Sequence, residues 1–254
     1  TRINNSPEQI QFNQEQQDNS SGQNAGYTQG LKDGYEEATS NSMKSNGSEA
    51  YKEGFALGYN KGFKEGKDKI EAEKVQVAKD GYALGGIQDE LLVPKEYANN
   101  VILKKSFEDG FNKAVNERIE AKKIEMSDLG YTDGRKNVYS LPKDIDEVYI
   151  KAYQGGYEKG QKELEEEYTN QGYEAAFTML AYKEASFSNP KFIEWYQLGF
   201  DSNNEIEKIK NAGYTLGENG EEYIISTEYK KGEVIFKNYF NLVREEYEAQ
   251  RRAT

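Results

Sequence analysis

A small residue followed by an aromatic residue recurs at four-residue steps along most of this sequence. The longest run is Gly54-Phe55, Gly58-Tyr59, Gly62-Phe63 and Gly66, and variants extend from Gly26 to Gly217. Residues four apart lie on one face of a helix, so the step predicts helices. Each glycine inside a helix costs about 1 kcal/mol relative to alanine. Close packing offsets that cost if a second helix approaches the glycine face nearly to backbone contact.

Ten of these glycines are the expected helix-packing positions: Gly54, Gly58, Gly62, Gly66, Gly110, Gly130, Gly156, Gly160, Gly199 and Gly213. Seven aromatic residues beside or between them are candidates for interaction with a partner: Tyr59, Tyr82, Tyr131, Tyr157, Tyr173, Tyr214 and Trp195. Rings stack well on sugars, peptides and partner helices. A ring at helical spacing is nevertheless more often part of a core, which is the simpler expectation for all seven.

The chain divides into a polar tail and a repeat region. Residues 1–24 are rich in Gln, Asn, Ser and Glu, and their small apolar surface predicts a disordered linker. Residues 25–254 are the predicted helical repeat domain. Pro94, Pro142 and Pro190 are evenly spaced and each is followed by Lys, so each is expected to start a helix. The approximate units are 25–93, 94–141, 142–189 and 190–254.

The predicted fold is all-α. Each unit holds two clusters of small and aromatic residues, which is typical of tandem helical hairpins with small-xxx-small seams, a seam being the line of contact between two packed helices. One β alternative stays open over residues 214–226. There, Glu218-Asn219-Gly220-Glu221 could form the turn of a strand hairpin.

Composition excludes several functions. The mean hydropathy of −0.98 is low for a globular enzyme. The net charge of −12 argues against nucleic acid and anionic membrane surfaces as partners, because both require Lys and Arg as counter-charges. The chain has no His and no Cys, so Ser-His-Asp and Cys-His centres, disulfides and thiolate metal sites are excluded. The stretch from Gly62 to Lys67 has the wrong spacing for a phosphate loop, and Asp68 stands where Ser or Thr would hold Mg²⁺.

We therefore expect no catalytic residue, no cofactor site and no metal site. A two-carboxylate glycosidase needs no His, but no pair among the 45 acidic residues is marked out. An envelope hydrolase using such carboxylates is the third and weakest hypothesis.

The segment from Ala50 to Gly66 resembles the glycine-repeat helix of the FliH family of export-ATPase regulators, in which aromatic residues also tend to follow the glycines. The resemblance covers this segment alone. It implies a cytosolic regulator that dimerises through Gly54 to Gly66, and it assigns no functional residue.

The leading hypothesis is a non-catalytic structural or protein-binding repeat protein of the bacterial cell surface. Its partner would be a protein or an envelope polymer. Formation of a homodimer is a further hypothesis. No apolar run reaches the roughly 18 residues of a membrane span. The start at Thr1 without Met fits a removed signal peptide or lipid-anchored segment, and a cytoplasmic location is the alternative.

Overall fold

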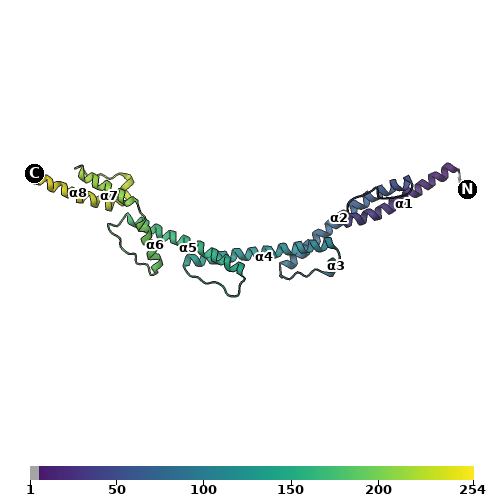
Figure 1. Ribbon diagram of the computed structural model, residues 1–254, viewed down its shortest axis with the longest axis horizontal. Coiled ribbons are helices and arrows are strands. Elements are labelled where there is room, and N and C mark those ends of the chain that lie inside the picture. Colours follow the sequence, from purple (N-terminus) through teal and green to yellow (C-terminus); the bar gives the residue numbers. More distant parts are fainter. Residues whose placement is uncertain (1–5) are drawn as a thin grey trace. The chain divides into compact units, whose positions relative to one another are not determined.

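The computed structural model describes residues 6–254 and divides into two units, Thr1–Ala121 and Lys122–Thr254 (Figure 1). Helices make up 76% of the described residues, and no strand occurs among them. The all-α prediction is therefore confirmed.

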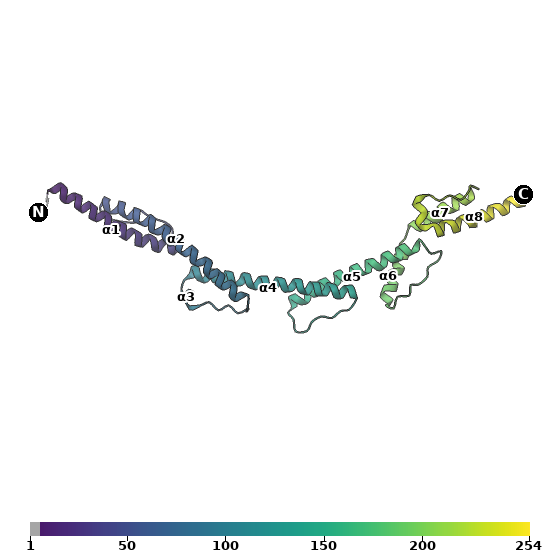
Figure 2. The ribbon, with the colours of Figure 1, turned by 180° about the vertical axis from the view of Figure 1, so that it is seen from behind.

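The first unit contains three helices and the beginning of a fourth. They are α1 (Pro7–Tyr35), α2 (Glu49–Gly85), α3 (Lys95–Ala98) and α4 (Val101–Lys136), which continues into the second unit. The second unit adds α5 (Glu147–Ala176), α6 (Pro190–Asp201), α7 (Glu205–Glu218), the 3-10 helix η1 (Thr227–Gly232) and α8 (Glu233–Ala253). Opposite views show α1 beside α2 in one unit and α7 beside α8 in the other (Figures 1 and 2).

Helix α1 begins inside the segment predicted to be a disordered linker. The Ser6 hydroxyl accepts a hydrogen bond from the Gln9 backbone N–H at 3.2 Å, and Pro7 occupies the first turn. Amide side chains then bridge successive turns, as from Gln14 to Asp18 at 2.8 Å. The linker prediction is therefore wrong over residues 7–24, because capping and side-chain bridges support a helix that has little apolar surface. Residues 1–5 lie outside the described residues.

The prediction that each of the three Pro-Lys pairs starts a helix holds at some positions and fails at others. Pro190 starts α6, and the Asn189 side chain accepts from the Lys191 N–H at 2.9 Å. Pro94 precedes only the four-residue α3. Pro142 starts no helix: the chain stays non-helical until Asp146, the N-cap of α5. The strand hairpin over residues 214–226 is also wrong, since α7 runs to Glu218 and residues 221–226 form no strand.

Packed helices run in the same direction. Along α1 and α2, Gly22 faces Tyr51, Gly26 faces Phe55 and Gly34 faces Phe63, so both residue numbers rise together. The same rise occurs for α2 with α4, α4 with α5, α5 with α6, and α7 with α8. Register contacts that show it are Gly81–Phe107 with Gly85–Phe111, Gly130–Tyr153 with Gly134–Tyr157, Tyr168–Phe192 with Gly172–Tyr196, and Gly213–Phe236 with Gly217–Phe240.

The predicted antiparallel hairpins are therefore wrong. A hairpin pairs antiparallel helices, whereas here a long connection returns the chain to a point inside the preceding helix, as where Ser48 before α2 donates to Asp18 of α1 at 2.8 Å. Residues 36–48 connect α1 to α2 in this way. Helix α2 packs on α1 through its first half and on α4 through its second, so one helix belongs to two successive pairs.

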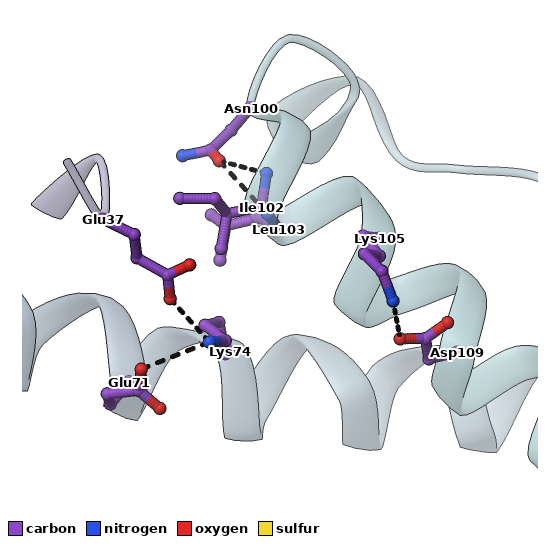
Figure 3. A network of polar contacts seen from close by, with 8 residues as sticks. All are labelled: Glu37, Glu71, Lys74, Asn100, Ile102, Leu103, Lys105 and Asp109. Carbon is purple, nitrogen blue, oxygen red and sulfur yellow. Dashed lines mark hydrogen bonds and ion pairs between the residues drawn. The ribbon is translucent and has the colours of Figure 1, made fainter. Parts of the chain in front are cut away.

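Polar contacts fix the region where α2 meets the start of α4 (Figure 3). Lys74 of α2 binds Glu37 at 2.6 Å and Glu71 at 3.2 Å. The Asn100 side chain accepts from the backbone N–H groups of Ile102 and Leu103 at 3.0 and 3.1 Å, which caps α4. Leu103 also belongs to a small apolar cluster with Ile70, Val77 and Phe107.

Candidate functional site

The contacts between parallel helices are the most regular chemical feature of the molecule. A Cβ atom added to Gly58 would overlap the backbone carbonyl oxygen of Gln23 on the facing helix. The same holds at all ten glycines predicted to pack helices, each against a carbonyl of a neighbouring helix. No residue other than glycine fits these positions without separating the two backbones.

Both helices of a pair contribute such glycines. Gly54, Gly58, Gly62 and Gly66 of α2 meet α1, while Gly22, Gly26, Gly30 and Gly34 of α1 meet α2 in return. Others that the sequence prediction omitted are Gly81, Gly85, Gly134, Gly172 and Gly217. At each site the glycine Cα hydrogen points toward a carbonyl oxygen, an arrangement that allows weak Cα–H···O contacts. We call each such line of contacts a glycine seam.

Tyrosines bridge these seams at regular positions. A tyrosine that follows a seam glycine donates its hydroxyl hydrogen bond to a glutamate on the helix that packs against its own. The exception is Tyr173 of α5, which donates to Glu205, the first residue of α7. The pairs are Tyr27–Glu65, Tyr35–Glu73, Tyr82–Glu117, Tyr131–Glu163 and Tyr173–Glu205. We call each pair a tyrosine clamp. The hydrogen bond to the carboxylate raises the tyrosine pKa in all five, because it is made to the protonated hydroxyl.

A lysine completes four of the clamps. It lies one turn before the glutamate on the same helix and places its ammonium group over the tyrosine ring. The distances from Nζ to the ring centroid are 6.0 Å for Lys61 and Tyr27, 5.4 Å for Lys69 and Tyr35, 5.9 Å for Lys113 and Tyr82, and 5.6 Å for Lys159 and Tyr131. Each ring is thus held by a cation on its face and a carboxylate at its hydroxyl.

Two buried tyrosines form hydrogen bonds both to an aspartate of the preceding helix and to the connection between the two helices. The Tyr59 hydroxyl donates to Asp33 at 2.6 Å and accepts from the Asn41 backbone N–H at 3.1 Å. Tyr153 makes the same pair of bonds, donating to Asp133 and accepting from the Ser140 N–H at 2.8 Å. Both side chains are fully buried. An aspartate at the end of one helix therefore fixes a tyrosine of the next helix and the loop between them.

These hydrogen bonds shift the pKa values of their members. Burial, followed by the hydrogen bond to Asp133, raises the pKa of Tyr153 to about 12. The hydroxyl of Tyr59 stabilises the Asp33 carboxylate and lowers its pKa. Both groups therefore keep their ordinary charge state at neutral pH, as structural hydrogen-bonding groups do.

The seven candidate interaction aromatics lie in three settings. Tyr59 and Trp195 are buried, and Trp195 packs beside Phe192 at 5.8 Å between ring centroids. Tyr82, Tyr131 and Tyr173 belong to clamps. Tyr157 is partly buried with its ring edge-on to Tyr139 at 5.0 Å, and Tyr214 is 41% exposed. Tyr59 and Tyr82 lie in the first unit, and the other five lie in the second.

An open groove of about 740 Å³ lies between α7, residues 224–229 and the start of α8. Its lining includes the apolar residues Ala212, Leu216, Ile225 and Phe236, together with Lys208. No Asp or Glu lines it, so it holds no pair of carboxylates that could act as acid and base.

Within residues 6–254, no group of three or more acidic side chains could hold a metal ion. No helix in that range is long and apolar enough to cross a membrane. Comparison with protein-family models, curated proteins and solved structures found no match to this chain.

Proposed function

We propose that this chain is a non-catalytic structural repeat protein. The observation that carries the proposal is the recurrence of one assembly, a glycine seam bridged by a tyrosine clamp, between successive helices. Repeat proteins of this kind depend on contacts between neighbouring elements and present extended surfaces to partners. Proteins or envelope polymers are the partners we propose.

The hydrogen-bond partners of the acidic side chains support a structural role. Five glutamates accept tyrosine hydroxyl hydrogen bonds across seams, and Asp33 and Asp133 accept from buried tyrosines. Catalytic carboxylates are typically paired in a cleft with separated pKa values. Here the acids that have precise partners are spread along the helix pairs and have structural partners.

This geometry does not support the alternative hypothesis, in which the chain is a FliH-like regulator that dimerises. It requires the glycine face from Gly54 to Gly66 to meet a second copy. In this structure α1 of the same chain covers that face. A dimer through these glycines would first have to displace α1.

We further propose a place on the bacterial cell surface. The absence of cysteine fits secreted proteins of Gram-positive bacteria. Protease treatment of intact producing cells tests the location: loss of the protein without lysis supports it, and protection until lysis contradicts it.

A substrate screen tests the lack of catalysis. Purified protein is incubated with nucleotides, peptidoglycan and generic ester and glycoside substrates, and its binding to cell walls is measured in parallel. We expect no turnover, and we expect saturable wall or protein binding that decreases when α7 and α8 are removed. Turnover abolished by changing one carboxylate would overturn the proposal.

A further inference from the structure

We propose that the glycine seams are shear joints that bear tension along the chain. This inference rests on the proposed structural function and adds the load that the structure would carry. In a shear joint the two helices are pulled lengthwise past each other, so every contact along the seam resists together.

The direction of α1 and α2 determines how tension acts on them. At one end of the pair, the Asn19 side chain of α1 donates to the Ala50 carbonyl of α2 at 3.2 Å. At the other end, Tyr35 of α1 contacts Glu73 of α2. The chain enters this pair along α1 and leaves along α2, at opposite ends. Tension therefore pulls the helices in opposite directions along their common axis.

An antiparallel hairpin would respond differently. Its chain enters and leaves at the same end, so tension separates the two helices there and breaks their contacts one after another. The parallel direction and the returning connection of residues 36–48 convert the same pull into sliding.

The seam surface opposes sliding by its shape. The carbonyl groups of Asn19, Gln23 and Tyr27 each occupy the space left by a glycine of α2. Sliding by one residue, about 1.5 Å, would place these carbonyls against positions that have side chains. A slip of about a whole turn, roughly 5.4 Å, in the direction of the tension brings Gly54 to the Gln23 carbonyl and Gly58 to the Tyr27 carbonyl, but it leaves the Asn19 carbonyl against Ala50.

A one-turn slip also breaks the polar contacts that are specific to this register. It separates Tyr27 from Glu65 and Tyr35 from Glu73. It also draws Tyr59 away from Asp33 and from the Asn41 N–H of the connection. The glycines thus provide the barrier to slipping, and the tyrosines make the original register the stable one.

Force spectroscopy on the full chain tests this inference. Because the chain has no cysteine, two introduced cysteines give unique attachment points. Gln17→Cys with Val75→Cys places the handles at opposite ends of the α1–α2 seam and loads it in shear. Gln17→Cys with Glu49→Cys places both handles at one end and peels the same seam apart. All three positions are exposed.

We expect the shear pair of handles to rupture at a force several-fold higher than the peeling pair. Replacing Tyr27 and Tyr35 by Phe should lower the shear force, whereas Tyr214→Phe in the other unit should leave it unchanged. Equal forces in the two directions would overturn the inference. That result would leave the substrate screen unaffected, and catalytic turnover in the screen would overturn the proposed function without altering the force ratio.

Discussion

Gly58 and Gly155 both lie inside helices but have opposite surroundings. A Cβ at Gly58 would overlap the Gln23 carbonyl, whereas a Cβ at Gly155 would meet nothing within 4 Å. Gly155→Ala should therefore raise the free energy of unfolding by about 1 kcal/mol, the gain in helix propensity. Gly58→Ala should lower it by roughly 1–3 kcal/mol, and Gly58→Leu by more, because the backbones must separate.

Denaturant unfolding of these variants measures the difference. An increase in stability for both alanine variants would show that the glycine at position 58 is not required for packing. A decrease for both would mean that helix propensity does not control position 155.

The raised pKa of Tyr153 predicts a loss of stability in alkali. Its pKa is about 12 in the folded chain against about 10 for an unperturbed tyrosine. The unfolded chain therefore releases this proton first, so the contribution to stability is complete below pH 10 and declines as pH rises to about 12. Unfolding measured across this range should show the decline, and Tyr153→Phe should make it less steep, the rest being due to other tyrosines with raised pKa values such as Tyr223. An equally steep decline in the variant would assign the effect to other groups.

At the scale of the elements, Tyr59 should decide whether the connection between α1 and α2 stays in place. Tyr59→Phe removes the donor to the buried Asp33 carboxylate and the acceptor for the Asn41 N–H. We expect a loss of about 1–3 kcal/mol, typical of a buried polar group left without its partner. Amide exchange at Asn41 should also become faster. Tyr214→Phe, at an exposed tyrosine, is the matched control and should change neither measurement.

The sequence predicted the helices and the glycine positions but not the direction in which the helices pair. A four-residue step identifies a helix face, and a glycine face packs equally closely on a parallel or an antiparallel neighbour. The direction depends on connections such as residues 36–48 and on partners far apart in sequence, such as Asp33 with Tyr59. Lys61 and Glu65 are four residues apart on one helix, which is the spacing of an ordinary surface ion pair. The sequence therefore did not reveal that Lys61 lies over the Tyr27 ring and that Glu65 accepts the Tyr27 hydroxyl hydrogen bond.

At the scale of the whole molecule, contacts between neighbours predict local rather than global unfolding. Trp195 is the only tryptophan and lies in the second unit, so its fluorescence reports on that unit alone. Gly58→Ala should lower the midpoint of the first part of the dichroism transition and leave the Trp195 midpoint unchanged. If both signals shift together, the chain unfolds as one cooperative body and this prediction is wrong.

The tyrosine clamps join residues only 32 to 38 positions apart, although they connect separate helices. Low contact order favours rapid folding, and a chain under synthesis folds from its N-terminus. Once Glu73 has left the ribosome, α1 already has all the partners it needs for its clamps. Each later helix would then be added to a finished neighbour, so the molecule can assemble in the order in which it is translated.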